Sequence, residues 1–105
     1  MENIKKEVLE NFSIDVFIDE LKNKMLKSGL NVDKLEYDVL KDGTYNFIYH
    51  INPDSNCQIG RIKINKRSSK MQIIKKNDVV WIQNETMETY LNYIDKWIEY
   101  TKQLG

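Results

Sequence analysis

Apolar residues recur at helical spacing in two parts of the chain. Between residues 14 and 28 they fall at every third or fourth position, and the same spacing returns from about residue 85 to the end. This period lines apolar side chains along one side of a helix. It predicts a helix near 14–28 and a second helix from about residue 85, whose apolar side is formed by Met87, Tyr90, Leu91, Ile94, Trp97, Ile98, Thr101 and Leu104.

Local signals mark both ends of the first helix. Ser13 can accept a hydrogen bond from a free backbone N–H as the N-cap, and Phe12 and Phe17 occupy the two positions of a hydrophobic staple. Gly29 can supply the left-handed residue that ends the helix. Ahead of it, the apolar positions within residues 4–12 predict a short preceding turn or helix.

Between the two helices the apolar period changes to two, which is typical of half-buried strands. Leu35, Tyr37 and Val39 alternate with charged residues, and a second alternating run covers residues 44–51. The turn signal Lys-Asp-Gly lies between these runs, at residues 41–43. The two runs therefore predict a hairpin.

Turn residues divide the rest of this region into further strands. Residues 52–56 have turn chemistry, a third strand is expected from about 58 to 65, and residues 66–69 reverse the chain into a fourth. Residues 79–82 extend the sheet after a bend. We predict a single α+β domain over residues 1–105 in the order α-β-β-β-β-α, an antiparallel sheet with the N- and C-terminal helices packed on one face.

Residues 60–76, called the basic hairpin below, carry seven cationic side chains and no acidic one, although the formal net charge of the chain is zero. Strand alternation directs its apolar residues Ile62, Ile64, Met71 and Ile73 toward the helices. The opposite face is called the outer face. We expect it to carry Arg61, Lys63, Lys70, Gln72 and Lys76, with Lys66 and Arg67 at the hairpin tip. Ile74 should be exposed there unless another part of the chain covers it.

The charge is segregated along the chain. Residues 1–59 carry a net charge of −4, the basic hairpin +7 and residues 77–105 −3. Such a dipolar molecule can steer toward an anionic partner. Three interpretations of the basic hairpin stay open: a solvated face that blocks pairing of sheet edges, a docking face for an acidic protein surface, and a grip on nucleic-acid phosphates.

The element order is similar to that of double-stranded-RNA-binding domains, which run α-β-β-β-α and contact RNA with a helix, a hairpin loop and lysines at the start of the last helix. Here that helix start, residues 84–88, reads Asn-Glu-Thr-Met-Glu and is acidic, and the chain has an extra strand. Tyr45, Phe47 and Tyr49 are expected to face the helices instead of stacking on bases. The similarity is one of topology, and it does not assign the family.

Few residues carry the signals of catalysis or metal binding. His50 lies in a strand and points to the face opposite Tyr49, and no motif supplies it with an orienting partner or a nucleophile. The only sequence signal that could activate the Cys57 thiolate is the set of cations in the next strand. Asp38, Asp42 and Asp54 lie near strand ends, where they can converge, but their spacing matches no calcium loop. No phosphate-binding glycine loop is present. We therefore expect a protein that is not an enzyme and has no cofactor and no metal.

The last helix offers a second surface. Tyr93 and Tyr100 are seven residues apart and lie together beside its apolar stripe. They are expected either to cover a sheet edge with the ring buried and the hydroxyl in water, or to anchor a partner protein or a homodimer through this helix.

Composition indicates the cellular compartment of the protein. Apolar residues make up 41% and charged residues 30% of the chain, which is the profile of an ordinary soluble globular protein. The lone Cys57 can form no intramolecular disulfide, the first residues lack the apolar run of a signal peptide, and no apolar run approaches the ~20 residues of a membrane span. We expect a cytoplasmic protein without membrane contact.

The absence of alanine beside abundant Lys, Asn, Ile and Tyr indicates an AT-rich genome, such as that of a low-GC bacterium or its phages.

Together these patterns favour a small non-enzymatic protein that binds a macromolecule, in the manner of an inhibitor, an antagonist or an immunity protein encoded by a phage or mobile element. Its expected contact residues are Arg61, Lys63, Lys66, Arg67, Lys70, Tyr93 and Tyr100. The alternative is a nucleic-acid-binding module that uses the same hairpin.

Overall fold

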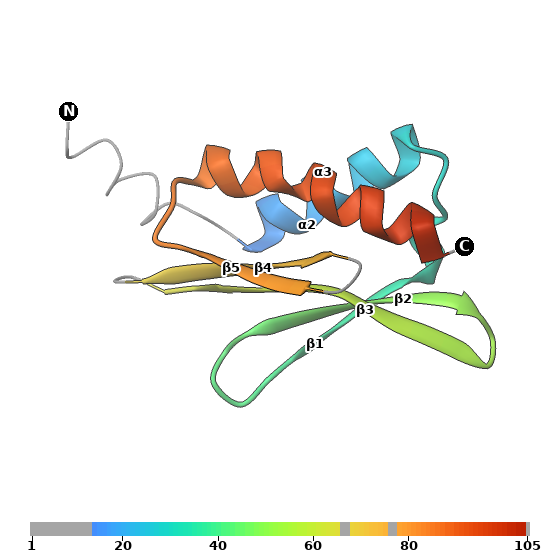
Figure 1. Ribbon diagram of the computed structural model, residues 1–105, viewed down its shortest axis with the longest axis horizontal. Helices are drawn as coiled ribbons and strands as arrows, with labels where there is room; N and C mark the ends of the chain where they lie inside the picture. The colour runs from blue at the N-terminus through green and yellow to red at the C-terminus, as the bar shows by residue number, and fades with distance from the viewer. Residues whose placement is uncertain (1–13, 66–67, 76–77, 105) are drawn as a thin grey trace.

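One antiparallel sheet carries both described helices on the same face (Figure 1). The computed structural model describes residues 14–65, 68–75 and 78–104. The elements are α2 (Ile14–Lys27), the short 3-10 helix η1 (Val32–Lys34), β1 (Leu35–Val39), β2 (Tyr45–Asn52), β3 (Ser55–Ile64), β4 (Ser69–Lys75), β5 (Asp78–Gln83) and α3 (Met87–Leu104).

The five strands follow one another in space in the same order as in the chain, β1-β2-β3-β4-β5. Each neighbouring pair is antiparallel and consecutive in the chain, which is the simplest arrangement for such strands. The predicted α+β class, with an antiparallel sheet under two helices, is confirmed, and residues 79–82 extend the sheet as the fifth strand, β5. Neither α2 nor α3 has the length and apolar character needed to span a membrane.

The helix predicted near 14–28 is α2. It ends at Lys27, and Gly29 follows with a left-handed backbone angle φ of +81°. The N–H of Leu30 then donates to the carbonyl oxygen of Met25 at 2.9 Å. The turn at Gly29 therefore gives one of the last helical carbonyls a hydrogen-bond donor. The predicted N-cap Ser13, the staple residue Phe12 and the helical pattern of residues 4–12 lie outside the described residues.

The core forms where the two helices meet the centre of the sheet. Its fully buried members come from α2 (Phe17, Leu21, Met25), from α3 (Tyr90, Ile94, Trp97) and from the strands (Phe47, Ile59, Ile62, Met71). Rings from α2, α3 and the sheet are in contact, with Trp97 5.3 Å from Phe17 and 5.5 Å from Phe47 between ring centroids. Aromatic residues from the helices and from the sheet therefore form one cluster.

Trp97 lies directly on the sheet because Gly60 has no side chain. A Cβ atom at Gly60 would overlap the indole ring of Trp97. The ring also donates its Nε1–H to the backbone carbonyl oxygen of Gln72 at 2.7 Å, so that the buried indole is satisfied. A β-bulge at Ile59 brings Gly60 to this position, since Phe47 pairs with Gly60 whereas the next residue, Ile48, pairs with Gln58.

The structure corrects the expected burial of β1. The strand is present, but only Leu35 of its three apolar residues is partly covered, while Tyr37 and Val39 are exposed. The twist of the sheet carries the far end of the β1–β2 hairpin away from the helices (Figure 1). Tyr37 instead packs against the rings of Tyr45 and Phe47 on the neighbouring strand.

Gly60→Ala tests the close approach of Trp97. The added methyl group forces the ring or the strand to move, so we expect a loss of roughly 1–3 kcal/mol in the free energy of unfolding, measured by urea denaturation. In a Trp97→Phe background, where the larger ring is gone, the same change should cost much less. Equal losses in the two backgrounds would contradict the contact.

Candidate functional site

The basic hairpin is built from β3 and β4, and it brings two lysines together. Ile62 pairs with Met71, and both side chains are fully buried on the helix face. The next pair along the ladder is Lys63 with Lys70. Because successive strand residues alternate, both cations lie on the outer face, as predicted, and the register places them directly opposite one another.

Lys63 is held by an aspartate from another hairpin. Its Nζ lies 3.6 Å from Oδ2 of Asp42, in the turn between β1 and β2. The other oxygen of Asp42, Oδ1, accepts the backbone N–H of Thr44 at 3.0 Å. The hydrogen bonds from Thr44, together with the nearby charges of Lys63 and Lys70, hold the pKa of the Asp42 carboxyl below its ordinary value.

Lys70 is held by an aromatic ring. Its Nζ lies 4.8 Å from the centroid of Trp81 on β5, within the range of a cation–π contact. Trp81 pairs with Gln72 across the β4–β5 ladder, so it belongs to the outer face. Its role beside the lysine could not be read from the sequence, because the register between β4 and β5 decides which ring lies under which cation.

The remaining polar residues of the outer face form a hydrogen-bonded layer. Nε of Arg61 donates to Oδ1 of Asn46 at 3.2 Å, and Nε2 of Gln58 donates to Oε1 of Gln72. Gln72 is only 8% exposed, although the sequence predicted a solvated residue. The prediction was wrong because Gln72 lies in a central strand of the sheet, where neighbouring side chains cover it.

Lys66, Arg67 and Lys76 lie outside the described residues. Near Ser68 and Ser69, the described end of the basic hairpin forms a hollow of about 280 Å³ lined mainly by polar side chains. Its lining residues are Lys63, Ser68, Ser69, Lys70, Gln83 and Asn84. Both paired lysines thus border a concave polar surface.

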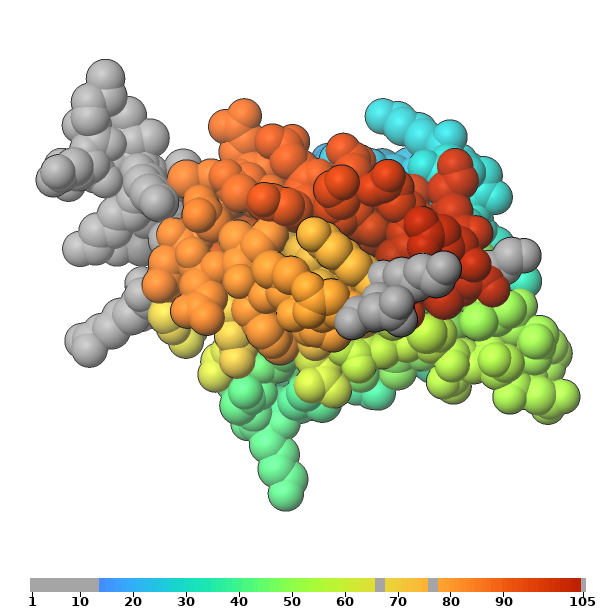
Figure 2. All heavy atoms as spheres, viewed as in Figure 1, coloured from blue at the N-terminus to red at the C-terminus, as the bar shows by residue number. Residues whose placement is uncertain are grey.

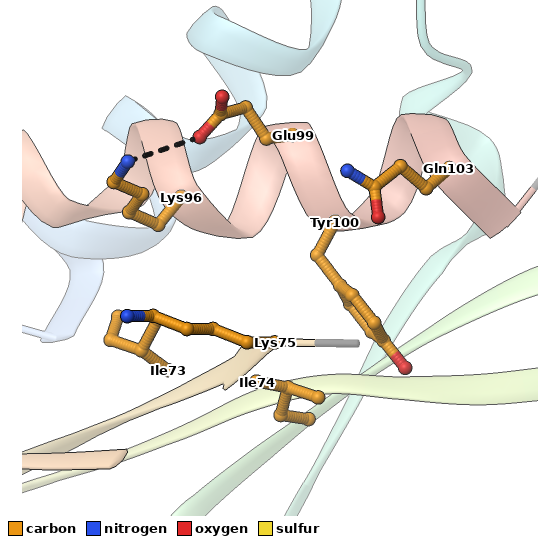
Figure 3. A pocket seen from close by; sticks show the side chains of 7 residues that line it. All are labelled: Ile73, Ile74, Lys75, Lys96, Glu99, Tyr100 and Gln103. Carbon is orange, nitrogen blue, oxygen red and sulfur yellow. Dashed lines mark ion pairs between the residues drawn. The ribbon is translucent and has the colours of Figure 1, made fainter. Parts of the chain in front are cut away.

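Tyr93 and Tyr100 of α3 have different surroundings. Tyr93 is 36% exposed. Tyr100 is half-buried, and Figure 3 shows its ring pointing from α3 toward the sheet beside Ile73 and Ile74. Its hydroxyl lies 3.7 Å from Sγ of Cys57, and this hydrogen bond, with partial burial, raises the pKa of Tyr100 above its ordinary value. Ile74, expected to be exposed unless something covers it, is partly covered at this place.

The residues considered for chemistry do not come together. His50 lies on the outer face with Nε2 2.7 Å from Oε2 of Glu36 on β1. Asp42 and Asp54 lie in the turns at opposite ends of β2, so these two carboxylates do not converge. Within residues 14–65, 68–75 and 78–104, no three His, Cys, Asp or Glu side chains are grouped in a way that could hold a metal ion.

Comparisons with protein-family models, with curated proteins and with solved structures find no match to this chain.

The lowered pKa of Asp42 can be tested by following its carboxyl carbon in an NMR pH titration. We expect a midpoint below the value of about 3.9 for an unfolded aspartate. Since the folded-state pKa is depressed, the ionised carboxylate stabilises the fold above the unfolded pKa, and this contribution is lost as the pH falls through the folded pKa. Thr44→Val should raise the midpoint toward the ordinary value, because it removes the hydroxyl but keeps a branched side chain. An unchanged midpoint in this variant would contradict the role of Thr44.

Proposed function

We propose that this protein is a small non-enzymatic binding protein that acts by occupying an acidic surface of a partner protein, as an inhibitor, an antagonist or an immunity-type protein does. The observation that supports it best is the pairing of Lys63 with Lys70 on a sheet face that neither α2 nor α3 covers. The cytoplasm of a low-GC bacterium, with the gene on a phage or mobile element, is the proposed setting.

The electrostatics of the lysine pair favour an anionic group from outside. Like charges directly opposite on neighbouring strands destabilise a sheet, by an amount on the order of 0.2–1 kcal/mol. Asp42 supplies one carboxylate to the pair, and Trp81 supplies no net charge. One positive charge is therefore left uncompensated by these partners, and a carboxylate of a binding partner can neutralise it between the two Nζ atoms.

Other contacts can widen this interface. Arg61 borders the lysine pair on the outer face, and Lys66 and Arg67 continue the charge along the chain. Tyr93 offers a second contact on α3. A homodimer through α3 is compatible with the proposal, because it would leave the outer face of the basic hairpin accessible.

Direct nucleic-acid binding through the same hairpin is the rival function. Phosphate contacts are lost steeply with salt, by about 0.9 log units of affinity per contact for each log unit of salt on B-DNA. Binding of duplex and single-stranded probes at low salt would favour this rival. We expect no binding to either probe, measured by fluorescence anisotropy.

The main test compares three tagged forms of the protein in capture experiments from its native host. We expect the wild type to retain a partner protein that Lys63→Glu/Lys70→Glu loses by about 100-fold or more, because juxtaposed like charges across an interface cost several kcal/mol. Lys22→Glu/Lys27→Glu reverses the same number of charges on exposed positions of α2 and should retain the partner. Urea denaturation checks that all three forms are folded.

Equal capture by wild type and by Lys63→Glu/Lys70→Glu would show that the basic hairpin is only a solvated face. Loss of the partner from both charge-reversed forms would assign binding to overall charge and would also contradict the proposed site.

A further inference from the structure

The edge strand β5 exposes three consecutive apolar side chains, and it lies next to the basic hairpin. β5 pairs with β4 on one side, and α3 packs mainly over β3 and β4 (Figure 1). Val79, Val80 and Trp81 are consecutive residues of β5, and their exposed fractions are 47%, 38% and 37%. Figure 2 shows the orange atoms of β5 at the surface, below those of α3. Three adjacent exposed apolar side chains on an edge strand favour pairing with another strand.

The ladder between β4 and β5 shows which backbone groups face this edge. The N–H of Asn84 donates to the carbonyl oxygen of Ser69 at 2.9 Å, in register with the pairs of the ladder. Since antiparallel pairs alternate between bonded and non-bonded, the N–H and C=O groups of Val79, Trp81 and Gln83 point away from β4. The N–H of Val79 is bound by Oδ1 of Asp78 at 2.9 Å, in agreement with this alternation. Trp81 and Gln83 therefore present donors and acceptors to an incoming strand.

The two edges of the sheet differ in how they are protected. β1, the other edge strand, carries the exposed acidic residues Glu36 and Asp38. Charged side chains of this kind oppose pairing of edge strands. β5 has no charged residue after Asp78, its first residue, and it contains no proline. The unprotected edge is thus the one beside the lysine pair.

Charge decides between the occupants of this edge. Lys70 lies opposite Gln83 and Lys75 lies opposite Asp78 on β4, so a lysine flanks β5 at each end. Lys75 and its partner Asp78 point to the helix face, where Asp78 can compensate the lysine, whereas Lys70 points to the outer face, where Trp81 gives it no negative charge. A second copy paired through β5 would bring only Val79, Trp81 and Gln83 to that outer face, and none of them carries a carboxylate for Lys70. A strand with acidic side chains on its outer face supplies one.

We propose that β5 binds an extended acidic segment of a partner protein as a sixth, antiparallel strand of the sheet. This inference rests on the proposed function, because it says how the acidic partner reaches the lysine pair. Backbone hydrogen bonds to Trp81 and Gln83 supply affinity, apolar residues on the helix face of the segment cover Val80, and carboxylates on its outer face approach Lys70. Apolar and acidic residues must therefore alternate in the segment.

The test uses an octapeptide in which glutamate alternates with valine, and a control octapeptide in which lysine replaces glutamate. Hydrogen exchange of the backbone amides is followed by NMR. With saturating acidic peptide we expect exchange at Trp81 and Gln83 to slow at least tenfold, and the lysine peptide to have no effect. The backbone amides of β1 should not respond, because Glu36 and Asp38 repel the acidic peptide.

A matched pair of variants isolates the backbone contact. Gln83→Pro removes an outward N–H without removing a bond to β4, whereas Gln83→Thr keeps the N–H in a strand-forming residue. We expect the proline variant to lose at least tenfold in peptide affinity and the threonine variant to bind as the wild type does. Retention of the Asn84 amide signal confirms that the β4–β5 ladder is intact in both.

Several results would overturn the inference. One is an unchanged amide exchange rate with the acidic peptide, and another is equal binding of both peptides. A third is slow exchange at Trp81 and Gln83 that appears without peptide and increases with protein concentration, because it would show that a second copy of the chain occupies the edge. In the host capture experiment, a partner lost by Lys63→Glu/Lys70→Glu but kept by Gln83→Pro would refute the edge and leave the proposed function standing. A partner kept by both variants would refute the proposed function itself.

Discussion

The contact between Trp97 and Gly60 sets the distance between the helices and the sheet. The indole ring can rest on β3 only where a residue lacks a side chain, and its Nε1–H then reaches the carbonyl oxygen of Gln72 on β4. The same ring contacts Phe17 of α2 and Phe47 of β2. One side chain thus joins both helices to three neighbouring strands. Because protein interiors are close-packed, a change of one methyl group at this point affects the whole layer.

This central contact also explains which parts of the sheet stay open. α3 is anchored over β3 and β4, and the sheet twists away from it toward both edges. The end of the β1–β2 hairpin and the edge of β5 therefore lie outside the cover of α2 and α3, and their apolar side chains are exposed. The lysine pair lies on the opposite face of the same central strands. Packing on one face thus leaves a charged face and an apolar edge side by side for a partner.

The sequence was most informative where a single period decides the structure. α2 and α3 were found from their apolar spacing, and the β1–β2 hairpin from its alternation and from Gly43, whose φ is +89°. The location of Lys63 and Lys70 on the same outer face also followed from alternation on either side of a turn, whereas their direct pairing is a matter of register. The sequence could not indicate the partners of these lysines, because Asp42 and Trp81 come from segments whose positions depend on twist and register.

The amino-acid sequence by itself determined the element types, their order and the face of each strand that turns toward the helices. These features depend on interactions between residues a few positions apart, and on the fact that an apolar stripe must be buried. Only the tertiary structure decided that β1 lies beyond the helices, that Gln72 is buried, and that the edge of β5 is open beside two lysines. These properties depend on a bulge at Ile59, on sheet twist and on where one tryptophan finds room, and each of them is set by contacts between distant segments.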